Sequence, residues 1–175
     1  MAVQVGSPTP PFKAKAYLPE SDVFEQVSLQ QLTDTWICLL FFPAAFSALC
    51  PTELIAFNEK SAQFARRGCT LLACSTDSHH ALRGWCQSDE PLALLKFPLL
   101  SDITKRMAMD YGVLLADQGI ALRGTFIIDP QGVLRAATVY DKYVGRNVDE
   151  VLRCLDALQT GAPCPCNWQK GDATL

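Results

Sequence analysis

The change from a strand to a helix around Cys50 constrains the fold of this chain most strongly. Residues 36–42 are continuously apolar and end at Pro43, a pattern typical of a buried strand. Apolar side chains then recur at helical spacing and predict an amphipathic helix that ends near Gly68. Pro51 suits the first turn of a helix, because its missing N–H has no helical acceptor there. Cys50 is therefore expected within the first turn, close to unpaired backbone N–H groups.

This position favours a reactive form of Cys50. A free thiol is mostly protonated at neutral pH, and the thiolate is the nucleophile. The N-terminal end of a helix dipole favours an anion, and a nearby Arg would favour it further. Ser47 precedes Cys50 by three residues, so its hydroxyl can reach the sulfur across one turn. The alternative is that Cys50 is a small buried hydrophobe, as most of the eight cysteines should be.

Composition limits the possible functions. The 175 residues suit one domain, and 49% apolar content is typical of a globular protein. Net charge is −3 with no basic cluster, so we expect no nucleic-acid binding. No segment approaches the roughly 18 apolar residues that span a bilayer, so we expect no membrane association. Residues 1–6 lack the pattern of a signal peptide, and we expect a cytoplasmic protein whose cysteines are mostly reduced.

Local patterns predict an α/β chain. We expect strands at 12–18, 22–27, 36–42, 69–75, 99–100, 122–129 and 133–139. We expect helices at about 50–67, 78–87, 102–109 and 147–158. The turn at 129–132 is a hairpin signal, and Asn147 provides a helix cap. A strand–helix–strand unit followed by a hairpin and a terminal helix indicates a layered sheet.

Metal binding has little support. Structural zinc takes four ligands, commonly from two paired motifs. The chain offers Cys164 and Cys166 as one pair, but Cys69 and Cys74 lie in an expected core strand. The adjacent histidines, His79 and His80, are more typical of a solvated helix start than of a pair of metal ligands. We therefore expect neither a metal nor a cofactor.

Four motifs carry a family resemblance. They are Pro43, Ser47 and Cys50 followed by Pro51-Thr52-Glu53; Arg123-Gly124-Thr125-Phe126-Ile127-Ile128-Asp129; Val144-Gly145-Arg146; and Cys164-Pro165-Cys166-Asn167-Trp168. In this order they resemble the typical two-cysteine peroxiredoxins, which include the peroxidase component of bacterial alkyl hydroperoxide reductase. The resemblance implies a thioredoxin-like α/β fold, with a central mixed sheet flanked by helices over residues 1–160. Residues 161–175 would form a C-terminal arm that carries the resolving cysteine.

The resemblance also implies a reaction. Cys50 would attack a hydroperoxide and become a sulfenic acid. From its apolar strand alone, Arg123 would more often be a surface residue, but the resemblance implies that it contacts the sulfur and polarises the peroxide. Ser47 stands where Thr is more common and would help to hold the substrate, and Pro43 would shield the sulfur from water.

The second half of the implied reaction needs another thiol. Cys164 matches the resolving position, and Cys166, where Ala is usual, stays open as the alternative. In the typical class this thiol comes from the partner subunit, so a homodimer is implied, and dimers of this class often assemble into decamers. A thioredoxin-like protein or a flavoprotein would then reduce the disulfide.

Three further residues match supporting positions of the family. Glu53 and Arg146 would hold Arg123 by ionic contacts, although both are also plausible as solvated charges. Trp85 would pack near the site, and a simple core role explains it equally well. As a function, a peroxide-sensing relay or a holdase chaperone remains the alternative to a peroxidase.

Overall fold

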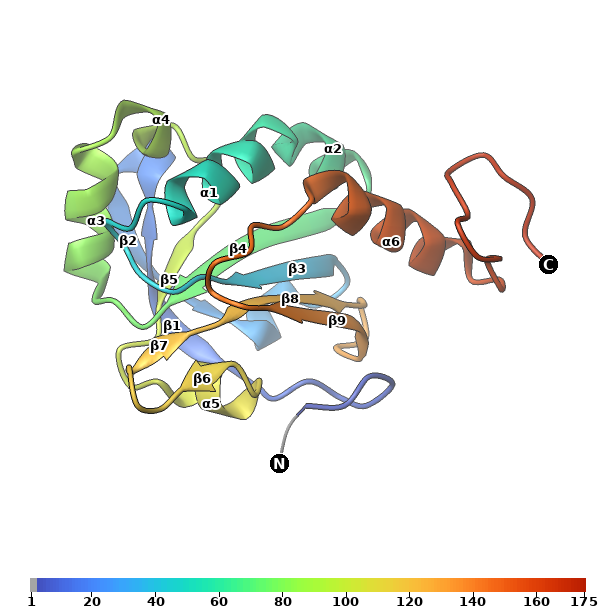
Figure 1. The fold of residues 1–175 in the computed structure, drawn as a ribbon, viewed down its shortest axis with the longest axis horizontal. Coiled ribbons are helices and arrows are strands. Elements are labelled where there is room, and N and C mark those ends of the chain that lie inside the picture. Colours follow the sequence, from blue (N-terminus) through green and yellow to red (C-terminus); the bar gives the residue numbers. More distant parts are fainter. Residues whose placement is uncertain (1–2) are drawn as a thin grey trace.

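A mixed sheet with helices on both faces forms the body of the protein. The computed structural model describes residues 3–175 (Figure 1). The strands are β1 (Lys13–Leu18), β2 (Val23–Ser28), β3 (Trp36–Phe41), β4 (Cys69–Ser75), β5 (Leu99–Ser101), β6 (Leu114–Leu115), β7 (Ile120–Ala121), β8 (Arg123–Ile128) and β9 (Leu134–Tyr140). The helices are α1 (Cys50–Glu59), α2 (Ser61–Arg66), α3 (His79–Gln87), α4 (Glu90–Ala93), α5 (Arg106–Asp110) and α6 (Val148–Thr160), with short 3-10 turns at Pro19–Ser21 and Leu29–Leu32.

Seven strands follow the order β2-β1-β5-β4-β3-β8-β9. The pairs β3–β4 and β4–β5 are parallel, and the other pairs are antiparallel. Helices α1, α2 and α6 cover one face, while α5 lies on the other (Figure 1). The expected mixed sheet flanked by helices is confirmed. The small β6–β7 hairpin was not predicted, because two-residue strands leave no detectable periodicity.

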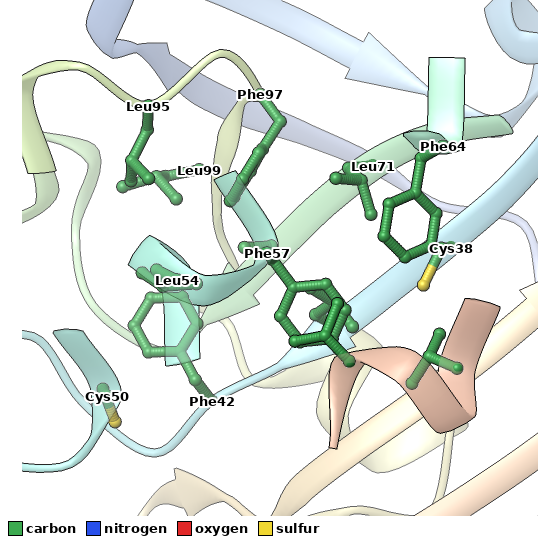
Figure 2. Packing of buried hydrophobic residues seen from close by; sticks show 14 of the residues in the cluster. Cys38, Phe42, Cys50, Leu54, Phe57, Phe64, Leu71, Leu95, Phe97 and Leu99 are labelled. Carbon is green, nitrogen blue, oxygen red and sulfur yellow. The ribbon is translucent and has the colours of Figure 1, made fainter. Parts of the chain in front are cut away.

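The central strand β3 explains why residues 36–42 are all apolar. Side chains alternate between the two faces of a strand, and both faces of β3 are covered. Ile37, Leu39 and Phe41 enter one core cluster, and Cys38, Leu40 and Phe42 enter the other. Figure 2 shows how the second cluster packs under α1, with Phe57 and Phe64 beside Cys38. This strand ends at the segment that carries Cys50.

The expected helix over about 50–67 is divided. It is broken at Lys60, whose backbone angles (φ −101°, ψ 7°) leave the helical range between α1 and α2. Both halves still face the same core, since the rings of Phe57 and Phe64 lie 5.9 Å apart. Neither Pro nor Gly marks the break, so no residue type predicted it.

The helix expected at 102–109 begins later. Asp102 acts as a cap from a distance, because its carboxylate accepts hydrogen bonds from the backbone N–H groups of Met107 (3.1 Å) and Ala108 (2.7 Å). Lys105 has a φ of 60° and turns the chain into α5. The prediction placed the helix start four residues too early.

The last helix and the arm are joined by several contacts. Asn147 caps α6 as expected, and Gly161 ends it with a φ of 67°. Beyond it, Trp168 is buried: its Nε1 donates to the Asp172 carbonyl, and its own carbonyl accepts from Arg153. The arm is thus held against α6, at the end of the molecule far from the start of α1 (Figure 1).

Asp156 links three segments and should contribute strongly to stability. Its carboxylate accepts two hydrogen bonds from Arg67, the residue that follows α2, both at 2.7 Å, and one from Lys170 of the arm at 2.8 Å. We expect Asp156→Asn to lower the free energy of unfolding by about 2 kcal/mol, because charged hydrogen bonds of a largely buried group are lost. Urea unfolding at pH 7 measures this change.

Asp22→Asn is the matched control, since Asp22 also binds an arginine, Arg83, through two hydrogen bonds but is exposed. Its effect should be much smaller. Equal losses in the two variants would contradict the assigned role of Asp156.

Candidate active site

Cys50 is the first residue of α1 and is fully buried. No side chain caps the helix there, so the N–H groups of its first turn are left without a side-chain acceptor. Thr52 donates a hydrogen bond of 2.7 Å to the Leu49 carbonyl and holds the turn that leads into the helix. The sulfur therefore lies at the positive end of a ten-residue helix, as the sequence predicted.

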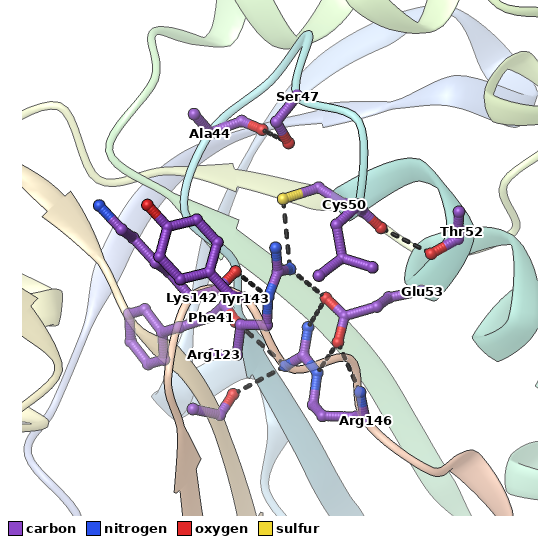
Figure 3. Close-up of polar contacts among 12 residues, drawn as sticks. Phe41, Ala44, Ser47, Cys50, Thr52, Glu53, Arg123, Lys142, Tyr143 and Arg146 are labelled. Atoms are coloured by element: carbon purple, nitrogen blue, oxygen red, sulfur yellow. Dashed lines mark hydrogen bonds and ion pairs between the residues drawn. The ribbon is translucent and has the colours of Figure 1, made fainter.

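Arg123 faces this sulfur from the neighbouring strand. Antiparallel pairing of β8 with β3 brings the start of β8 next to the chain that leaves β3. The Arg123 side chain is buried, its Nη1 donates to the Cys50 sulfur at 3.3 Å, and its Nε donates to the Lys142 carbonyl at 2.9 Å (Figure 3). Arg123 is a partnered charge and not a surface residue.

Glu53 and Arg146 complete a buried ionic cluster (Figure 3). The Glu53 carboxylate accepts hydrogen bonds from Arg123, from Nε and Nη2 of Arg146 at 2.9 and 3.0 Å, and from the Arg146 backbone N–H at 2.9 Å. Burial by itself raises the pKa of Glu53, but the attraction and hydrogen bonds of Arg146, with the charge of Arg123, outweigh it and lower that pKa. Neither residue is a solvated charge.

This cluster has an unbalanced charge. Two guanidinium groups and one carboxylate carry a net charge of +1, and their side chains are almost completely removed from water. A buried charge is costly unless it is paired. Arg123 also donates a hydrogen bond to the Cys50 sulfur. A thiolate at that position would neutralise the cluster. Arg123 thus directs a buried positive charge at the Cys50 sulfur.

The segment between β3 and α1 covers the sulfur. Pro43 is buried within it. Ser47 differs from expectation: its hydroxyl donates to the Ala44 carbonyl at 2.9 Å, and within residues 3–175 it forms no hydrogen bond with the Cys50 sulfur. The hydroxyl instead bonds a backbone carbonyl of its own turn, and serine side chains commonly bond nearby backbone groups in this way.

Trp85 supports this segment from α3. Its buried ring packs against Phe42 and against the largely exposed Phe46, with centroids 5.8 and 6.3 Å away. Asp77 adds a polar anchor, since its carboxylate accepts from the Ala45 backbone N–H at 2.8 Å. Trp85 therefore acts by packing, and no polar contact of its side chain with the site is found in the described residues.

The remaining core cysteines are chemically different from Cys50. Burial raises the pKa of Cys38 and Cys74 well above the ordinary value, and it raises that of Cys69 and Cys86 to about 12. It also raises the pKa of the half-buried Cys154. These thiols stay protonated at neutral pH and are unreactive core residues.

The two arm cysteines lie away from this site. Cys164 is half-buried against the end of α6, and Cys166 is exposed. The arm and the start of α1 lie at opposite ends of the chain in Figure 1. One copy of the chain in this conformation does not bring either arm cysteine to Cys50.

Sequence reasoning missed the backbone groups of the site. The carbonyls of Phe41 and Gly124 each accept from Arg146 Nη1 at 3.0 Å, and residue type does not report such acceptors. The importance of Gly124 could have been inferred from the sequence, because a glycine inside a strand often marks a place where another group approaches the backbone closely. A Cβ at Gly124 would lie 2.7 Å from Phe126 and 2.9 Å from Val113.

Residues 3–175 contain no group of three or more His, Cys, Asp or Glu side chains placed to hold a metal ion. None of the helices described for this chain combines the length and hydropathy required to cross a lipid bilayer.

A buried thiol at a helix start, facing a guanidinium on a mixed sheet, defines a thiol-based redox protein. Residues 5–137 match the model of the AhpC/TSA family, so this chain belongs to that family, whose relatives are peroxiredoxins.

Individual relatives are similar in sequence to this chain along its whole length. A thioredoxin peroxidase of Echinococcus granulosus is 45% identical over 182 aligned residues, covering 100% of this chain and 93% of that protein. Peroxiredoxin TSA1 of Saccharomyces cerevisiae is 43% identical and covers 100% and 92%.

Solved structures confirm the thioredoxin-like fold. The reduced 2-Cys peroxiredoxin of Plasmodium vivax superposes with a TM-score of 0.92 at 37% identity, covering 97% of this chain and 91% of that one. AhpC of Mycobacterium tuberculosis gives a TM-score of 0.86 at 35% identity and covers 97% and 100%. These names describe peroxidases and do not favour the sensing or holdase alternatives.

The ionic cluster predicts a pH dependence of stability. The pKa of Glu53 is lower in the folded than in the unfolded chain, so its contribution is fully present above about pH 4.5 and is lost as pH falls through the folded pKa. We expect Glu53→Gln to reduce this acid-dependent loss. At pH 7 the variant should lose about 3 kcal/mol, because two buried guanidinium groups lose their counter-charge.

Urea unfolding between roughly pH 3 and pH 7 measures both effects. This range spans the pH values at which carboxylates titrate. Glu59→Gln is the control, because Glu59 is exposed on the same helix. An acid dependence unchanged by Glu53→Gln would contradict the role of this carboxylate.

Proposed function

We propose that this protein is a thiol-dependent peroxidase that reduces hydrogen peroxide and organic hydroperoxides at Cys50. The observation that carries the proposal is the buried contact of 3.3 Å between the Cys50 sulfur and Arg123, inside a cluster with one excess positive charge. Family membership supports the same activity.

In the first half of the reaction, the Cys50 thiolate attacks one oxygen of ROOH. The O–O bond breaks, the sulfur becomes a sulfenic acid, and the leaving RO⁻ takes up a proton to become ROH. Negative charge moves from sulfur to the leaving oxygen, so Arg123 and the free N–H groups of α1 are placed to stabilise both states. Glu53 and Arg146 are positioning residues that hold Arg123.

The covering segment has a proposed role in this step. Pro43, which is buried in the segment between β3 and α1, excludes water from the sulfur. Ser47 binds the peroxide when its hydroxyl turns from the Ala44 carbonyl to the substrate, a small rotation for a serine. Trp85 keeps the segment in place through Phe42 and Phe46.

In the second half, a thiol condenses with the sulfenic acid to form a disulfide and water. We assign this thiol to Cys164 of a second copy, because the arm of the same copy lies at the opposite end of the chain. Cys50 has no exposed surface, so the first turn of α1 has to open before a partner can reach it. That turn has no side-chain cap, which lowers the cost of opening it.

These assignments imply an assembly and a reductant. A homodimer, the unit from which decamers of this class assemble, would exchange arms of residues 161–175 between thioredoxin-like bodies of residues 1–160. A thioredoxin-like protein or a flavoprotein would reduce the disulfide. The eight free cysteines support a reducing compartment, and we propose the cytoplasm.

Cys50→Ser tests the function directly. We expect complete loss of peroxide consumption in the presence of a dithiol reductant, because serine cannot become a sulfenic acid. Cys154→Ser, a change at a half-buried bystander, should keep normal activity. If Cys50→Ser still consumed peroxide, the proposal would fail.

Arg123→Lys tests the electrostatic part. Lysine keeps the charge but cannot bridge the sulfur, Glu53 and the Lys142 carbonyl at once. We expect the second-order rate constant with hydrogen peroxide to fall about 100-fold, the usual cost of losing one charge-stabilising donor. Arg135→Lys, at a half-exposed ion pair with Asp129, is the control and should react like the original protein. Stopped-flow single turnovers give both rate constants.

A further inference from the structure

The arm carries two thiols on one tightly held turn, and the proposed reaction uses only one. Cys164 and Cys166 are separated by Pro165 alone. The turn is closed by a hydrogen bond of 3.1 Å from the Trp168 N–H to the Pro165 carbonyl, and Asn167 has a φ of 59°. Buried Trp168 fixes the turn to the rest of the arm.

The two sulfurs differ in their access to solvent. Cys164 lies against the end of α6, with its sulfur 3.7 Å from the Ala157 carbonyl, 3.6 Å from the Ala162 carbonyl and 3.5 Å from the Thr160 hydroxyl. Cys166 is exposed on the turn. A bulky reductant therefore has a clear path to Cys166 and an obstructed one to Cys164.

We propose that Cys166 is a third redox thiol that moves the disulfide from the active site into the arm. This step rests on the proposed function, which supplies the oxidising equivalent as a hydroperoxide. The Cys166 thiolate attacks the Cys164 sulfur of the Cys50–Cys164 disulfide. A Cys164–Cys166 bond forms, the Cys50–Cys164 bond breaks, and Cys50 leaves as a thiolate. No electrons are gained or lost overall.

The active site favours this direction of exchange. A thiolate that is stabilised by its surroundings is the better leaving group in thiol–disulfide exchange. Cys50 has Arg123 and a helix start for this purpose. Exchange also frees Cys50 to return to its buried position, and it leaves the disulfide on an exposed turn where a reductant can reach it.

A single turnover without reductant tests this relay. Protein is treated with one equivalent of hydrogen peroxide, quenched with N-ethylmaleimide at successive times and run on non-reducing gels. In the original protein we expect a covalent dimer that forms and then decays to monomer. In Cys166→Ser we expect the dimer to decay roughly tenfold more slowly or not at all, because the exchanging thiol is missing.

Peptide mapping locates the final disulfide. Cleavage before Asp156 and after Lys170 releases residues 156–170, which hold Cys164 and Cys166 as their only cysteines. We expect this peptide to be two hydrogens lighter and unlabelled in the oxidised original protein. Cys154→Ser is the matched control and should behave like the original protein.

Two results would overturn the relay. One is a dimer equally persistent in the original protein and in Cys166→Ser, with residues 156–170 still linked to the Cys50 peptide. The other is a dimer kept by Cys164→Ser and lost by Cys166→Ser, which would make Cys166 the resolving thiol. A dimedone adduct on Cys50 in the Cys164→Ser, Cys166→Ser double variant would show that the peroxidase function stands in either case. Its absence would refute the proposed function itself.

Discussion

The buried ionic cluster of Arg123, Glu53 and Arg146 is the interaction on which the rest of the structure depends. Removing three charges from water is expensive, and it is tolerated only because their hydrogen bonds are nearly all made within the protein. Those bonds join α1, the end of β3, the start of β8 and the loop before α6. The same network that holds these elements together leaves one positive charge facing the Cys50 sulfur.

This arrangement separates reactivity from access. The sulfur is enclosed by the segment between β3 and α1, so it meets the guanidinium without competition from water. The arm that carries Cys164 and Cys166 is held by Trp168 and Asp156 at the far end of the same chain. In the proposed cycle, opening of the uncapped first turn of α1 and a second copy of the chain would together bring the arm to Cys50. Local stability in α1 therefore controls the balance between the two halves of the proposed cycle.

Much of the fold could be predicted, for identifiable reasons. Strand β3 was predicted because a continuous apolar run of this length is typical of a buried strand. Helix α6 was predicted because Asn147 and Gly161 mark its ends. The break at Lys60 could not be found, because it depends on how two helices settle on one core. The late start of α5 shows the same limit, since Asp102 caps a helix across an intervening turn.

Local residue patterns were enough to place Cys50 at the start of a helix after a buried strand, because apolar periodicity and Pro51 are local properties. Motifs that lie far apart along the chain were enough to indicate the family. The folded chain was needed to show that Arg123 is buried against the sulfur, that Ser47 bonds Ala44 instead, and that the arm lies away from the site. Those facts depend on which strands become neighbours and on which backbone carbonyls come within reach, and long-range pairing is not encoded in any one segment.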